Sequence, residues 1–223
     1  EVYGSIEEGS FDEDSMLSTS SPYSASKAGS DLLVLSHWKT YGTNVCITRC
    51  TNNFGPRQHE EKLLPKIITI LDAGGKIPIY GDGSNIRDWL YVKDHCLALV
   101  KIIQEGVSGE IYNIGAQDEK TNLDVARILL KSFEKTDDAM EFVEDRAGHD
   151  WRYSVDDGKI RNLGWNPLFS FEEGLEITRL WRRLWIPMRD REFGQLFESS
   201  SLGILTDWKA GDVFNVPAYE YHA

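Results

Sequence analysis

Short apolar runs alternate with amphipathic segments along most of the chain. The run over residues 44–50 contains Val45, Ile47 and Thr48, which is typical of a parallel strand buried on both faces. Leucines and isoleucines in residues 63–73 recur with the helical period and stop at two glycines. The pattern predicts helices over residues 22–41, 63–73, 94–105 and 122–133 and one starting near residue 170, strands over 44–50, 77–80, 89–92, 111–114 and 141–143, and loops over 5–21 and 52–56. Strands alternating with helices indicate an α/β fold.

Composition narrows the classes of partner. The 223 residues are 41% hydrophobic, enough for a real core, and the formal net charge of -12 argues against nucleic acid or an anionic membrane as the main partner. No apolar run is long enough to span a membrane. The three cysteines have no paired metal spacing, so we expect free thiols, no metal site and a cytoplasmic location.

Both ends of the chain look cut. It opens at Glu1 without an initiator methionine and stops at Ala223. We expect it to be a piece of a longer protein.

Tyr23 and Lys27 stand one helical turn apart in the segment that follows Pro22. Residues four apart share a helix face, so the ammonium can lower the pKa of the phenol and make it a base near neutral pH. Such a base can take the proton from a sugar hydroxyl, which requires the phenol to lie in a sugar-nucleotide cleft. The spacing alone is weak, because many helices carry it by chance.

Polar residues follow the predicted strands where ligands of open α/β sheets bind. Asn52 and Asn53 come directly after the strand over 44–50, although an Asx-rich turn explains them about equally well. Arg87 precedes a strand and can hold a diphosphate or make a surface ion pair. The loop over 145–149 adds Arg146 and His149 near a glycine.

These motifs occur in the order of a known family. Tyr23-Ser24-Ala25-Ser26-Lys27 is followed by the motifs of residues 52–56, 61–63, 78–81, 87–92, 112–115 and 145–149. Together they resemble the dTDP-glucose 4,6-dehydratases, which are extended short-chain dehydrogenase/reductases. The segments 62–63 and 145–149 point to the nucleoside-diphosphoglucose dehydratase branch.

The resemblance implies the fold and the domains. Residues 1–185 would form the later part of an NAD(P)-binding Rossmann-like domain plus the smaller substrate-binding α/β region. Residues 186–223 do not resemble the family and would be a separate tail. In that tail, residues 211–217 followed by His222 are similar to a cupin motif, while an incomplete β-hairpin is at least as good an interpretation.

The resemblance also implies the reaction, conversion of dTDP-glucose to dTDP-4-keto-6-deoxyglucose and water with catalytic NAD. Tyr23 would take the 4-hydroxyl proton, Lys27 would steady the phenolate and bond the cofactor ribose, and Glu1 would remove the C5 hydrogen. The acid that protonates the departing hydroxyl and the glycine-rich dinucleotide loop would lie before Glu1. The chain alone is therefore expected to bind NAD poorly and not to turn over.

Further residues are assigned by the same resemblance. Tyr23, Lys27 and Asn53 would contact NAD, and the longer protein would be a homodimer. The residues expected to bind substrate are Asn52, Lys62, Leu63, Pro78, Ile79, Tyr80, Arg87, Asn122, Arg146 and His149.

Two kinds of alternative stay open. Nucleotide-sugar 4-epimerases and UDP-glucuronate decarboxylases share oxidation at C4 on the same scaffold, and they differ at the acid/base pair of which Glu1 is one member. A nonenzymatic nucleotide-sugar binding module is the alternative from another class, and an intact Tyr23 and Lys27 speak against it.

Overall fold

The computed structural model describes residues 1–145 and 151–189, with side chains up to residue 184. The chain divides into two units, Glu1–Arg182 and Arg183–Ala223, and the strands that the structure describes lie in the first. Two sets of predictions lie outside the described residues: the substrate contacts of Arg146 and His149, and the β-motif of the tail.

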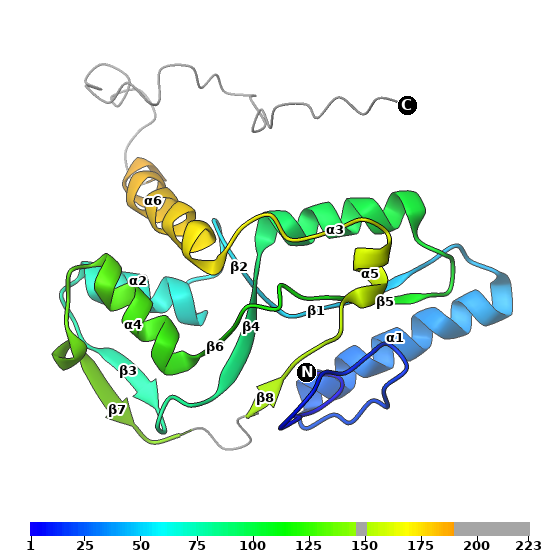
Figure 1. Ribbon diagram of the computed structural model, residues 1–223, viewed down its shortest axis with the longest axis horizontal. Coiled ribbons are helices and arrows are strands. Elements are labelled where there is room, and N and C mark those ends of the chain that lie inside the picture. The colour runs from blue at the N-terminus through cyan, green and yellow to red at the C-terminus, as the bar shows by residue number, and fades with distance from the viewer. Residues whose placement is uncertain (146–150, 190–223) are drawn as a thin grey trace, which may run out of the picture. The chain divides into compact units, whose positions relative to one another are not determined.

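The first sheet pairs β1 (Ile47–Cys50) with β5 (Ile111–Ile114) in parallel. Helices α1 (Pro22–Tyr41) and α3 (Val92–Glu105) lie on either side of these strands (Figure 1). The smaller core of the molecule forms here, and its buried residues are Leu90, Ala98, Ile102, Tyr112, Ile114, Ile160 and Trp165.

The second sheet is built around β4 (Ile86–Tyr91). Its neighbours β2 (Asn52–Phe54) and β8 (Arg152–Tyr153) run parallel to it, and β6 (Glu119–Thr121) runs antiparallel. The loop predicted for residues 52–56 is therefore wrong over Asn52–Phe54. At Thr51, whose N–H still donates to the Ile114 carbonyl at 3.0 Å, the chain leaves β5, and its next residues pair with β4 instead.

A third sheet pairs β3 (Ile77–Tyr80) with β7 (Met140–Val143) in parallel, and η1 (Asp137–Ala139) leads into β7. Helices α2 (Leu63–Asp72) and α4 (Asn122–Ser132) contact each other and this sheet. The larger core lies between them, and it includes Phe54, Leu64, Ile68, Ile77, Trp89, Val125, Leu129, Phe171 and Leu175.

Local sequence signals set the helix ends. Ser21 and Thr121 form capping boxes at the starts of α1 and α4, because each hydroxyl accepts from the backbone N–H three residues on. Gly42 ends α1 in the left-handed region at φ 66°, where glycine carries no steric penalty. Ser170 and Glu173 bond reciprocally at the start of α6 (Phe171–Arg189), so the helix start predicted near residue 170 is confirmed.

The strand predictions missed the shortest elements. β4 begins at Ile86 rather than at residue 89. β6, β8 and the helix α5 (Gly158–Asn162) were not predicted, because segments of two to five residues are too short to show a period.

Candidate functional site

The predicted Tyr23–Lys27 pair lies in the first two turns of α1. The Lys27 Nζ atom lies 5.5 Å from the centroid of the Tyr23 ring, so the two groups share one helix face as expected. Beyond this contact, the structure gives neither head group a hydrogen bond among the described residues. Both remain available to a ligand.

The surroundings of the phenol differ from the expectation. Tyr23 is 60% exposed and Lys27 is exposed, so the described residues do not enclose the phenol in a cleft. Only the small side chains of Ser24 and Ala28 turn into the molecule on this part of the helix. The sequence motif fixes the spacing of the pair but not what covers it.

Glu1 begins a segment that is tied to the start of α1. The Ser18 N–H, just before the helix cap, donates to the Val2 carbonyl at 3.0 Å. Gly4 has φ 87°, and a Cβ atom there would come within 2.6 Å of the Ser18 carbonyl oxygen, so only glycine allows this approach. The Glu1 side chain itself is exposed.

Three strands bring Arg87, Tyr153 and Asn52 together, a group that we call the Arg87 cluster. The Arg87 guanidinium lies over the Tyr153 ring, 4.6 Å from its centroid, and the Tyr153 hydroxyl donates to Asn52 Oδ1 at 2.6 Å. Arg87 also donates to the carbonyls of Ile86 and Trp151, at 2.6 and 3.1 Å. Two predicted substrate residues are thus brought together. Tyr153 was missed, because a two-residue strand after a polar loop gives no pattern.

Asn53, the predicted cofactor contact, lies next to Asn52 on β2. Its amide nitrogen donates to Cys50 Sγ at 3.1 Å and to the Thr51 carbonyl at 3.3 Å. Its Oδ1 atom is buried without a hydrogen-bond partner among the described residues. An amide oxygen left without a donor is unusual and costs about 1–3 kcal/mol.

The other predicted substrate residues are spread over several elements. Asn122 begins α4, and its N–H donates to the Asn85 carbonyl at 3.0 Å. Asn85 lies two residues before Arg87, and the neighbouring pair Ile86–Thr121 continues the same strand register. Lys62 is the residue before α2, makes no side-chain capping hydrogen bond there, and is exposed. Ile79 is buried in the larger core. The structure places Leu63 at the first residue of α2, and Pro78 and Tyr80 on either side of Ile79 in β3.

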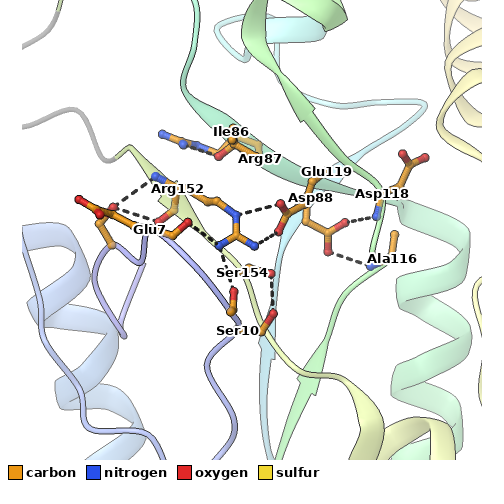
Figure 2. A network of polar contacts seen from close by, with 12 residues as sticks. Glu7, Ser10, Ile86, Arg87, Asp88, Ala116, Asp118, Glu119, Arg152 and Ser154 are labelled. Atoms are coloured by element: carbon orange, nitrogen blue, oxygen red, sulfur yellow. Dashed lines mark hydrogen bonds and ion pairs between the residues drawn. The ribbon is translucent and has the colours of Figure 1, made fainter.

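A second polar group, the Arg152 network, was not predicted. Figure 2 shows the Arg152 guanidinium facing the Glu119 carboxylate, which it bonds through two nitrogens at 2.9 and 2.8 Å. Burial opposes ionisation of Glu119, but bonds from Arg152 and Ser154 outweigh it and lower the pKa of the carboxyl. A cleft of about 580 Å³ opens here, lined by Ser10, Asp88, Gln117, Glu119, Arg152, Ser154, Val155 and Asp156.

Asp88 lines that cleft and is buried. Its two oxygens accept from the Ala116 N–H at 2.9 Å and the Asp118 N–H at 2.8 Å. Burial nevertheless raises the pKa of this carboxyl. Because both oxygens hold the loop before β6 in place, we interpret Asp88 as a residue that shapes the site rather than one that reacts.

The described residues contain no group of three or more His, Cys, Asp or Glu side chains that could hold a metal ion. No helix in this part of the chain has both the length and the apolar character needed to cross a membrane.

Comparison with known proteins identifies the family. Residues 1–178 match the family model described as GDP-mannose 4,6 dehydratase. The low-salt glycan biosynthesis protein Agl12 of Haloferax volcanii is 53% identical over 79% of this chain and 57% of its own length. The dTDP-glucose 4,6-dehydratase of an Actinoplanes species is 50% identical over 82% of this chain and 58% of its own. The chain therefore spans somewhat more than half the length of these relatives.

Solved structures agree. The dTDP-glucose 4,6-dehydratase DesIV of Streptomyces venezuelae, solved with NAD bound, has a TM-score of 0.79 at 50% identity and covers 82% of this chain and 57% of its own. The UDP-glucuronic acid 4-epimerase of Bacillus cereus, in complex with UDP-glucuronic acid and NAD, reaches 0.77 at 26% identity, covering 82% and 58%. The resemblance and the α/β fold class drawn from the sequence, including the Rossmann-like part, are confirmed.

Proposed function

The chain belongs to the GDP-mannose 4,6 dehydratase family, and we propose that the protein containing it is a nucleotide-sugar 4,6-dehydratase acting on dTDP-glucose. One observation carries the proposal: a Tyr23–Lys27 pair on one helix face, with Lys27 Nζ 5.5 Å from the centroid of the phenol ring, in a chain that is about half identical to dTDP-glucose 4,6-dehydratases.

The residues present fit the nicotinamide end of NAD. The buried Asn53 Oδ1 has no donor among the described residues, and Lys27 has three N–H donors for a ribose hydroxyl. Tyr23, Lys27 and Asn53 would hold that end of the cofactor. When bound, NAD would supply a hydride acceptor and donor.

Tyr23 would take the proton from the sugar 4-hydroxyl, as a general base in contact with its substrate. Lys27, on the same helix face, would stabilise the negative phenolate oxygen. Glu1 would remove the C5 hydrogen once C4 is a ketone, because a hydrogen next to a carbonyl is acidic. A group outside this chain's residues would protonate the departing C6 hydroxyl.

The Arg87 cluster would bind the nucleotide sugar. A guanidinium can grip a diphosphate through two parallel hydrogen bonds, and Arg87 is already oriented by the Tyr153 ring and two backbone carbonyls. Asn52 is oriented in turn by the Tyr153 hydroxyl. Among the remaining predicted contacts, Asn122 follows Thr121, which pairs with Ile86 next to Arg87. Lys62, Leu63, Pro78, Ile79 and Tyr80 stay proposals, together with Arg146 and His149.

Two further parts of the proposal rest on the family resemblance alone. We propose that the longer protein is a homodimer and that it works in the cytoplasm. A 4-epimerase is the alternative function, and the 26% identical epimerase structure supports it less well than the relatives at about 50% identity support dehydration.

The test is product analysis with a full-length protein containing this chain. With dTDP-glucose we expect a 4-keto-6-deoxy sugar by NMR, and Tyr23→Phe should lower its formation by at least about 10²-fold because the base is gone. Tyr41→Phe, at the far end of the same helix, is the matched control and should not change the rate. A 4-epimer as product would support the epimerase alternative, and full activity of Tyr23→Phe would exclude the proposed base.

A further inference from the structure

Arg49, on β1, lies where two segments of the candidate site meet. Its Nε atom donates to Asp31 Oδ2 on α1 at 2.8 Å, and its Nη1 atom donates to the Tyr3 hydroxyl at 2.7 Å. The side chains of Arg49 and Asp31 are 9% and 17% exposed. One partly buried guanidinium therefore bonds both α1 and the segment that begins at Glu1.

Tyr3, which accepts one of the two Arg49 hydrogen bonds, also contacts Asn113 and Phe11. Its hydroxyl donates to Asn113 Oδ1 at 2.8 Å, and its ring stacks on Phe11 with centroids 5.2 Å apart. Burial raises the pKa of Tyr3, although the Arg49 charge opposes this, so the hydroxyl stays protonated and can donate to Asn113 while it accepts from Arg49. Tyr3 is two residues from Glu1.

Asp31 continues the face that carries the catalytic pair. It follows Lys27 by four residues, and Lys27 follows Tyr23 by four, so the three side chains succeed one another turn by turn. A bond that fixes Asp31 therefore fixes the rotation of α1 about its axis, and with it the direction in which Tyr23 and Lys27 point.

On these contacts, and resting on the proposed function, we propose that Arg49 is a positioning residue that sets Glu1 and the Tyr23–Lys27 pair in register with each other. The planar Arg49 guanidinium donates its two hydrogen bonds, to Asp31 and to Tyr3, in fixed directions. A lysine ammonium does not have this fixed planar geometry. The Tyr3 arm positions the base for C5, and the Asp31 arm positions the base for the 4-hydroxyl. The contact of Val2 with Ser18 adds a backbone tie between the same two segments.

A structural role alone would lower stability without separating the two bases, so the test measures each base by itself. A full-length protein containing this chain is assayed with a nucleoside diphosphopentose, which has no C6 hydroxyl to lose and reports only C4 oxidation through NADH absorbance. Exchange of the C5 hydrogen of the 4-keto product with deuterated water, followed by NMR, reports the second base without any hydride transfer.

We expect the variants to divide according to the arm they remove. Tyr3→Phe keeps the ring and should slow C5 exchange about tenfold while C4 oxidation stays within about twofold, and Asp31→Asn should do the reverse. Arg49→Gln should slow both by on the order of 10²-fold, with partial recovery in Arg49→Lys. The KM for dTDP-glucose should stay within about twofold, because the hydrogen bonds that the Arg49 side chain donates among the described residues go to Asp31 and Tyr3 and not to the Arg87 cluster.

The control is Arg127→Gln, which removes another arginine–aspartate pair, with Asp137, on an exposed surface. It should leave both partial reactions unchanged. Equal effects of Tyr3→Phe and Asp31→Asn on the two reactions, or no effect of Arg49→Gln, would overturn the positioning role. If Tyr23→Phe still abolishes C4 oxidation in that case, the proposed function stands and only the role of Arg49 is lost.

Discussion

The two cores of the molecule differ in how completely they are covered. Around Leu129 in α4, the larger core is enclosed by α2, α4, α6 and the strands between them, and Leu129 has 0% exposure. Around β1 and β5, each of the helices α1 and α3 buries one of its own faces and leaves apolar side chains exposed on its opposite face. Leu33 on α1 is 64% exposed and Ile103 on α3 is 83% exposed.

The difference separates the two parts of the candidate site. Tyr80, on β3, belongs to elements that pack around the larger core, and Arg87 lies on β4, beside it. Tyr23 and Lys27 lie on α1, beside the smaller one. The elements with the proposed substrate-binding residues are thus packed around a core within the described residues, whereas the helix with the proposed base presents apolar side chains that those residues do not cover.

The largest expected effect comes from emptying the larger core. Leu129→Ala should lower the free energy of unfolding of this chain by about 2–5 kcal/mol, because it leaves a cavity among fully buried side chains. Leu33→Ala on the outer face of α1 should change it by less than about 0.5 kcal/mol. Urea unfolding monitored by tryptophan fluorescence measures both. A larger loss for Leu33→Ala would mean that the outer face of α1 is covered in solution.

The next effect tests whether the two cores unfold together. Asp94, in the first turn of α3, accepts from the Leu168 N–H at 3.0 Å and the Phe169 N–H at 3.1 Å, and Phe169 packs on the larger core. Asp94→Ala leaves two backbone donors without this acceptor and should cost about 2–3 kcal/mol. Asp94→Asn keeps one acceptor and should cost less. Separate transitions in far-UV circular dichroism and fluorescence for Asp94→Ala would show that this residue joins the cores.

A pH effect of intermediate size comes from His95 on α3. Burial lowers the pKa of His95, so the folded state binds a proton on this imidazole only at a lower pH than the unfolded state does. Its contribution to stability is complete above the unfolded pKa of about 6.5 and is lost as pH falls below it, at up to about 1.4 kcal/mol per pH unit. Urea titrations from pH 7.5 to 5 should lose this slope in His95→Gln and keep it in His37→Gln, which alters an exposed histidine. An unchanged slope in His95→Gln would contradict the burial of His95.

The smallest effect concerns one helix start in the well-covered part. Thr121→Ala removes the hydroxyl that accepts from the Asp124 N–H at 3.0 Å and should cost about 1 kcal/mol. Thr121→Ser keeps that oxygen and serves as the control. Equal losses in the two variants would mean that the methyl group of Thr121, and not its cap, stabilises α4.

The sequence predicted those features that have a local cause. Gly42 and Thr121 act on neighbouring backbone, so the end of α1 and the start of α4 were predicted. The Tyr23–Lys27 spacing follows from helix geometry in the same way. Asn52 was placed in a loop because its strand pairing with Trp89 depends on residues far along the chain.

The parts that were missed depend on tertiary contacts. The bond between Tyr153 and Asn52 joins residues 101 positions apart, and no sequence period announces it. The exposure of Tyr23 was also missed. A Tyr-x-x-x-Lys motif says which side chains share a helix face, but it does not say which other residues cover that face.

The proposed function requires that the hydrogen removed from C4 of the nucleotide-bound sugar returns to C6 of the same molecule. It is tested most directly with dTDP-glucose carrying deuterium at C4, turned over by a full-length protein containing this chain, with the product examined by NMR and mass spectrometry. We expect deuterium at C6 of a 4-keto-6-deoxy product. Deuterium that stays at C4 of an epimer, or that is lost to water, would contradict it.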